Sequence, residues 1–144
     1  MGLEIQRPTT IEGTLRQLQL VHACLIVSIL LYVFLMKLLQ LPNTESPSTN
    51  LVWGLAIESV VTLGVGFSIR SRKLSAAFQT LRVNPNDPGA LAQWRTGAII
   101  SDALAESVAL CGFVIHYLGG TSRQAAPFFA AGFLAMLLWW PRRP

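Results

Sequence analysis

The chain has 144 residues, of which 52% are hydrophobic and only 12% are charged, and its formal net charge is +4. A soluble domain of this length needs a more charged surface, so the composition excludes an ordinary water-soluble fold. The apolar residues also gather into runs of about 18 or more with few charges, which is typical of membrane-spanning helices. We therefore predict an all-α integral membrane protein, a bundle of four transmembrane helices that forms a single membrane domain over residues 1–144.

The first two predicted spans cover residues 17–39 and 51–69. The first has no charged side chain before Lys37, and about twenty residues at about 1.5 Å each match a hydrocarbon core of about 30 Å. A polar turn with two prolines separates it from the second span, which is interrupted only by Glu58.

The second half of the chain holds the other two spans. Residues 70–95 are predicted as a polar loop that begins as a helical extension, which the turn NPNDPG then breaks. The third span is 96–118, and the fourth and shorter one is 121–140, followed by PRRP.

Lysine and arginine are distributed unevenly between the two sides that these spans define. Cytoplasmic loops retain positive charge, so the richer side is predicted to face the cytoplasm, with both termini and the loop 70–95. That side holds Arg7, Arg16, Arg70, Arg72, Lys73, Arg82, Arg95, Arg142 and Arg143, whereas the other holds only Lys37 and Arg123. The net charge thus reflects topology. Nucleic-acid binding is not indicated, because the sequence has no basic patch interleaved with aromatic residues.

Two carboxylates stand inside the third span, in the stretch SDALAESVALCG. A charge at the bilayer centre costs at least about 2.5–3.5 kcal/mol, so Asp102 and Glu106 are expected to face the bundle interior. No lysine or arginine lies within any predicted span, so we expect these acids to have no basic partner in the same chain. They must then be protonated, share a proton, bind a cation or meet a positive group of another subunit.

Spacing predicts that the acids form a cluster. Asp102 and Glu106 are four residues apart and share one helix face, and Glu58 is expected at a similar depth in the second span. Removal from water favours the neutral form of a carboxyl, so such a group suits proton or sodium handling. Ser107 would add a neutral oxygen ligand. A protonated acid that merely bonds a neighbouring carbonyl and holds helices together is the alternative.

Residues 54–118 resemble subunit c, the ring-forming proteolipid of rotary ATP synthases. The resemblance rests on LGVGFSIRSRKLSAAF for the end of a first helix, LRVNPNDPG for the polar loop and WRTGAIISDALAESVALCGFVI for a second helix. It implies a helical hairpin with a cytoplasmic loop. It also implies that Glu106 is the ion-carrying acid and that Ser107 occupies a position that is Ser or Thr in sodium-binding members.

His22 and His116 are the remaining candidate site residues. They are predicted in opposite leaflets, roughly 25 Å apart in depth, so they cannot hold one haem together. Each could hold a separate pigment as an axial ligand, and the alternative is an interfacial histidine that meets headgroups or water.

The sequence thus predicts a multi-pass protein of the cell membrane, in the inner membrane of a bacterium. We expect it to bind, and to transfer, H⁺ or Na⁺ through Glu106, Asp102 and Glu58. The alternative is a small accessory subunit of a larger membrane complex, with or without a pigment. Hydrolase and nucleotide-binding motifs are absent from the sequence, so no enzymatic activity is expected. The expected partners are the bilayer and other membrane subunits or further copies of the chain.

Overall fold

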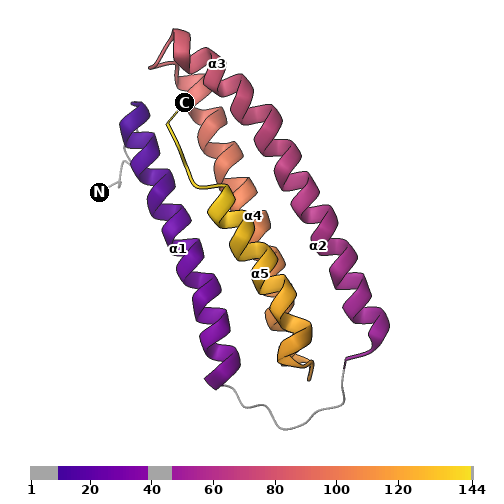
Figure 1. The fold of residues 1–144 in the computed structure, drawn as a ribbon. Helices are drawn as coiled ribbons and strands as arrows, with labels where there is room; N and C mark the ends of the chain where they lie inside the picture. Colours follow the sequence, from indigo (N-terminus) through magenta and orange to yellow (C-terminus); the bar gives the residue numbers. More distant parts are fainter. Residues whose placement is uncertain (1–9, 39–46, 144) are drawn as a thin grey trace, which may run out of the picture.

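The computed structural model describes residues 10–38 and 47–143, and all regular structure in these two segments is helical. The chain forms four rods, which are α1 (Ile11–Leu38), a continuous rod of α2, η1 and α3, then α4 (Pro88–Tyr117) and α5 (Ser122–Leu138) (Figure 1). The prediction of an all-helical fold is confirmed for this part of the chain.

The second rod is longer than the sequence suggested. α2 (Thr49–Ile69) passes through a π-helical turn, η1 (Arg70–Leu74), into α3 (Ser75–Val83), and α4 begins at Pro88. The prediction of a loop over 70–95 is therefore wrong except at residues 84–87, although the expected helical extension is confirmed. The rod continues because the stretch after Ile69 contains no helix breaker before Asn84 and Pro85.

Local capping explains where the helices begin and end. Asp87 accepts a hydrogen bond from the Ala90 amide at 2.7 Å, and Pro88 occupies the first turn of α4, where its missing N–H costs nothing. Between α4 and α5, Gly119 adopts a φ of 90°, and the amides of Gly119 and Gly120 bond back to the carbonyls of His116 and Ile115. This is a Schellman motif, in which glycine supplies the left-handed residue.

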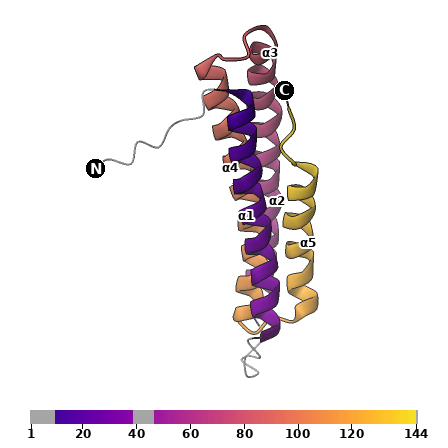
Figure 2. The same cartoon turned by 90° about the vertical axis from the view of Figure 1, so that its left-hand side faces the viewer.

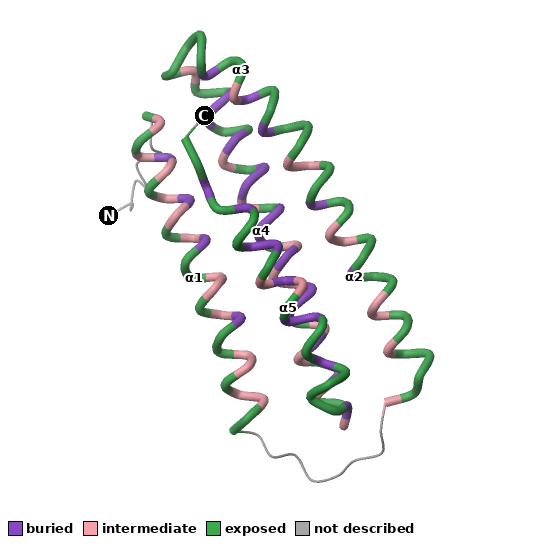
Figure 3. The backbone as a smooth tube through the Cα atoms, in the orientation of Figure 1, coloured by how far each residue is buried: buried purple, intermediate pink, exposed green. Residues whose placement is uncertain are grey.

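α4 is the central helix of the bundle. It contacts α1, α2, α3 and α5, whereas α1 and α2 lie on opposite flanks of it without touching one another (Figure 1). The view in Figure 2 shows α5 on one side of the layer formed by the other rods. Burial follows this arrangement, because most buried positions lie on α4 and α5 while α2 is largely exposed (Figure 3).

The lengths and surfaces of the rods indicate a multi-pass membrane protein. Within residues 10–38 and 47–143, three helices are long and apolar enough to cross a membrane: Ile11–Leu38, Thr49–Val83 and Pro88–Tyr117. The exposed surface carries large apolar side chains such as Val27, Phe34 and Val60. Such side chains are favourable in contact with the hydrocarbon of a bilayer and unfavourable in contact with water. α5 is shorter, with 17 residues.

Glycines bring α5 close to α4. A methyl group added at Gly132 would lie 2.7 Å from the Ala105 carbonyl oxygen, and one added at Gly112 would lie 2.9 Å from the Ala125 carbonyl oxygen. Small residues at helix contacts allow this close approach of two backbones within a membrane. The close contact fixes α5 against the central helix and so places the chain that follows α5 over the middle of the bundle.

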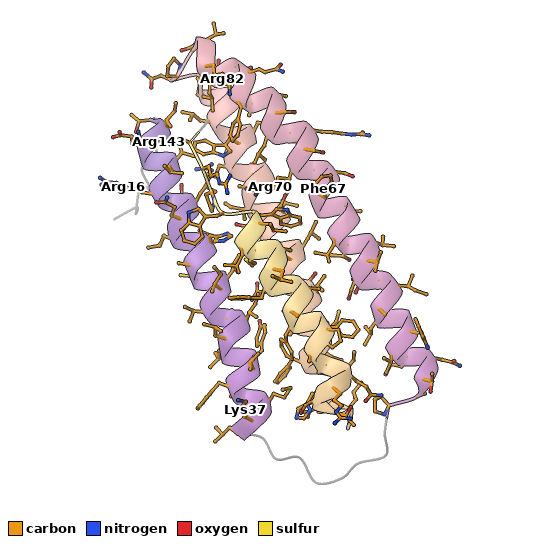
Figure 4. The ribbon with its side chains drawn as sticks, in the orientation of Figure 1. Arg16, Lys37, Phe67, Arg70, Arg82 and Arg143 are labelled. Atoms are coloured by element: carbon orange, nitrogen blue, oxygen red, sulfur yellow. The ribbon has the colours of Figure 1, made fainter. Side chains whose placement is uncertain are left out.

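Most basic residues of the described segments gather at one end of the bundle. We name the end that holds α3 and residues 141–143 the basic end. Figure 4 shows Arg82 and Arg143 toward that end and Lys37 at the opposite one. α1 begins and the described chain ends on this same side, as the charge pattern predicted. Which face of the membrane the basic end occupies stays a prediction.

Candidate functional site

Asp102 lies in the middle of α4 and is only 1% exposed. Its carboxylate oxygen Oδ2 is 2.8 Å from Nδ1 of His22, which comes from α1 and is fully buried. Since a carboxylate only accepts hydrogen bonds, Nδ1 carries the proton in this contact and Nε2 is left as the second ring nitrogen. A buried hydrogen-bonded acid–base pair therefore joins α1 to the central helix.

Arg70 approaches the same carboxylate from another rod. It is the first residue of η1, and its Nη1 atom lies 4.0 Å from Oδ1 of Asp102. Its Nη2 atom donates a hydrogen bond to the carbonyl oxygen of Trp139, at the end of α5, and the guanidinium carbon lies 5.9 Å from the centre of the Trp139 ring. Arg70 thus links the second rod, α4 and α5 around Asp102.

Glu106 stands one helical turn from Asp102 and also faces α1. The Ser28 hydroxyl donates to its oxygen Oε1 at 2.6 Å, and the Tyr32 hydroxyl donates to the same oxygen at 3.0 Å. Both hydroxyl groups belong to α1, so Glu106 adds a second polar contact between α1 and the central helix. We name the four residues His22, Arg70, Asp102 and Glu106 the acid–base cluster.

The charges of the acid–base cluster do not balance when His22 is neutral and both acids are ionised. Arg70 contributes one positive charge, whereas Asp102 and Glu106 contribute one negative charge each. Three buried polar atoms of the cluster, His22 Nε2, Arg70 Nη1 and Asp102 Oδ1, have no hydrogen-bond partner among the described residues. His22 Nε2 is therefore a basic atom without a hydrogen-bond partner that can accept a proton.

Glu58 does not join the other two acids. It lies on α2 and accepts hydrogen bonds from Thr62 at 2.9 Å and from the Cys111 thiol at 3.3 Å. Because α1 and α2 lie on opposite flanks of α4, Glu58 and Glu106 face different sides of the central helix. The structure thus brings Asp102 and Glu106 together along α1 and leaves Glu58 exposed on α2.

The remaining predicted site residues lie apart from the acid–base cluster. Ser107 donates its hydroxyl to the Leu104 carbonyl oxygen of its own helix at 2.8 Å. His116 contacts the Gly120 carbonyl oxygen through Nδ1 at 3.1 Å, beside the turn between α4 and α5. Within residues 10–38 and 47–143, no group of three or more His, Cys, Asp or Glu side chains is arranged to hold a metal ion.

Two sequence expectations about basic partners are wrong. The acids were expected to lack a basic partner in this chain, yet Asp102 contacts both His22 and Arg70. His22 was expected at the interface with headgroups or water, yet it is buried against Asp102 and packs in a T-shaped contact with the Trp140 ring. A pigment on His22 stays a prediction. Arg70 was missed because it was assigned to the loop, although its place directly after an apolar span allows an inward-pointing guanidinium.

The sequence analysis also did not predict the hydroxyl partners of Glu106, although their spacing in the sequence indicated them. Ser28 and Tyr32 are four residues apart in α1, so they share a helix face, as Asp102 and Glu106 do in α4. A polar face on each of two apolar helices predicts that the two faces meet.

Comparison with known proteins found similarity to part of one membrane transport protein. Over 94 residues, or 62% of this chain, the sequence is 38% identical to the inner membrane metabolite transport protein YgcS of Escherichia coli (strain K12). The match covers 20% of that protein, so the chain spans about one fifth of the length of this relative. No protein-family model and no solved structure matches the chain, so the resemblance to subunit c finds no support in these comparisons.

Proposed function

We propose that the acid–base cluster binds one proton in the interior of the membrane and that the chain serves membrane transport. The observation that carries the proposal is the buried His22–Asp102 hydrogen bond, which leaves His22 Nε2 without a partner. Uptake of one proton on His22 would produce an imidazolium with Asp102 on one side and Glu106 one turn away. The cluster would then hold two positive and two negative charges.

A proton suits the acid–base cluster better than Na⁺ does. A sodium ion needs several oxygen ligands, but the Ser107 hydroxyl is directed to its own helix and Glu106 Oε1 already receives two hydroxyl bonds. Arg70 also places a permanent positive charge 4.0 Å from Asp102, which repels a metal cation. Glu106, the ion-carrying acid under the subunit c resemblance, would here act as the countercharge to the protonated histidine.

The link with transport comes from the relative. YgcS is named a metabolite transport protein, and the chain matches about a fifth of it. We extend to this chain the general role of a transport protein, with the acid–base cluster as the group that gains and loses a proton. The proposal assigns the chain no catalytic role.

Histidine NMR tests the proposal, because the chain has only two histidines. In a His116→Gln background, ¹⁵N-labelled histidine in lipid nanodiscs reports His22 alone, and we expect it to change from the neutral to the doubly protonated form as pH falls. Adding Glu106→Gln removes one nearby negative charge, so the ratio of protonated to neutral His22 at the same pH should fall about tenfold.

Glu58→Gln is the matched control, because Glu58 lies on the other side of α4. It removes the same charge from the same protein and should leave His22 protonation unchanged. A His22 that stays neutral at every pH at which the protein is folded would exclude the proposal. Equal effects of the two glutamine variants would show that Glu106 is not the countercharge.

A second candidate function, an accessory subunit of a membrane complex, is favoured by Glu58. This carboxylate is exposed on α2 beside the exposed apolar side chains Ile57 and Val61. An acid that faces lipid is costly, whereas a basic or hydroxyl group of a partner helix would compensate it. Glu58 would then mark the contact with that partner.

Labelling with a hydrophobic carbodiimide distinguishes a Glu58 that faces lipid from one that a partner helix covers. The reagent modifies protonated carboxyls that it can reach from the lipid. In nanodiscs that contain the isolated protein, we expect Glu58 to be modified and the fully enclosed Asp102 to remain unmodified. Peptide mass spectrometry locates the adduct. Modification of Glu58 in nanodiscs but not in native membranes would support a covering partner, and equal modification in both would exclude it.

A further inference from the structure

A pocket of about 400 Å³ opens at the basic end, between the junction of α2 and η1, α4 and the chain that follows α5. Two arginines line it, Arg70 and Arg142, and no acidic side chain does. The rest of its wall is formed by aromatic and aliphatic side chains and two serines. The pocket therefore combines a positive charge with an apolar surface.

The two arginines differ in how far the protein compensates them, because Arg70 already contacts Asp102 and the Trp139 carbonyl oxygen whereas Arg142 has no acidic partner among the described residues. Arg142 is exposed and forms no ion pair within the described residues, whereas its neighbour Arg143 lies 3.5 Å from Glu12. Nη1 of Arg70 is buried without a hydrogen bond, and its nearest acid is Asp102 at 4.0 Å. Two like charges that line one pocket favour an anion between them, because guanidinium groups bind phosphate oxygens through paired N–H donors.

The apolar part of the pocket extends toward the region that lipid covers. Phe67 and Leu138 line it and are 64% and 77% exposed, so they offer an open surface to a hydrocarbon chain. Figure 4 shows Phe67 on the second rod, close to Arg70. Trp94, Trp139 and Trp140 also line the pocket, and tryptophan is enriched where hydrocarbon meets headgroups.

We propose that this pocket binds an anionic phospholipid. Arg142 and the outer side of Arg70 contact the headgroup phosphate, and one acyl chain lies along Phe67 and Leu138. The charge selects an anion, and the exposed apolar wall selects a lipid over free phosphate or a small soluble acid. The proposal goes beyond proton binding, and Arg142 lies outside the acid–base cluster, so a failure at one site is distinguishable from a failure at the other.

Native mass spectrometry of the full chain in detergent tests the proposal. Phosphatidylglycerol and phosphatidylcholine with the same acyl chains are offered separately, and we expect one phosphatidylglycerol to be retained at least about tenfold more strongly. Arg142→Gln should reduce its affinity about tenfold, since a charged hydrogen bond to phosphate is lost. Phe67→Ala should weaken both lipids without removing the preference for the anionic one.

Arg123→Gln is the matched control, because Arg123 is an exposed arginine at the opposite end of the bundle, in the first turn of α5. It should leave lipid retention unchanged, and the melting temperature of each variant verifies that it is folded. Equal retention of the two lipids would overturn the proposal, as would an Arg142→Gln variant with normal affinity. Displacement of the lipid by millimolar inorganic phosphate would assign the pocket to a soluble anion instead.

Discussion

Asp102→Ala is expected to lower the free energy of unfolding by about 3–5 kcal/mol, the range for removal of one partner of a buried ion pair. The substitution leaves the buried His22 and the Arg70 guanidinium without their carboxylate. Unfolding in mixed micelles with increasing dodecyl sulfate, followed by tryptophan fluorescence, measures the change.

Asp87→Ala is the matched control on the same helix. Asp87 caps the first turn of α4 through one hydrogen bond, and loss of such a cap costs about 1 kcal/mol. The two substitutions remove the same side chain, so the difference between them isolates the buried contacts. If Asp102→Ala were no more destabilising than Asp87→Ala, the contacts of Asp102 with His22 and Arg70 would contribute nothing to stability.

Gly132→Ala is expected to destabilise the bundle by about 1–3 kcal/mol, the cost of overpacking a tight contact. The added methyl group would lie 2.7 Å from the backbone oxygen of Ala105 and 3.0 Å from the side chain of Ala109. A backbone oxygen cannot rotate away as a side chain can, so α5 must move off α4. The same unfolding assay measures the loss.

Gly64→Ala should change the free energy of unfolding in the opposite direction. Gly64 lies within α2, and a methyl group added there meets no atom within 4 Å. Alanine is the better helix former by about 1 kcal/mol, so this variant should be as stable as the parent or slightly more stable. If Gly132→Ala destabilises the bundle and Gly64→Ala does not, backbone contact limits the spacing between α4 and α5. Equal effects would argue against it.

The pairing of Asp102 with Glu106 on one face followed from the sequence, because a spacing of four residues aligns two side chains on any α-helix. The partner helix was not predictable from that spacing. α1 and α2 are both apolar around most of their circumference, so hydrophobic periodicity does not indicate which side of each helix meets α4. For the same reason, Glu58 was expected beside Glu106, whereas it faces Cys111 on the other flank of α4.

Arg70 shows a different limit of sequence reasoning. Counting charges assigns each lysine and arginine to a side of the membrane by its position along the chain, and Arg70 directly follows an apolar span. This count of charges gives no information on the direction in which a long side chain points. In the structure, the helix continues past Ile69, so the guanidinium can turn inward to Asp102 while Arg72 and Lys73 remain exposed.

The shortness of α5 has a consequence for its own last turn. At about 1.5 Å per residue, 17 residues cover only about 25 Å, so the helix ends before it crosses a full hydrocarbon layer. The final carbonyl groups of a helix have no amide partner within it, and they form the negative pole of its dipole. Arg70 supplies both a donor and a positive charge there, so a residue of the second rod acts as the C-terminal cap of α5. A helix shorter than the hydrocarbon layer is thereby tolerated inside the bundle, and the position of Arg70 matches the point at which α5 ends.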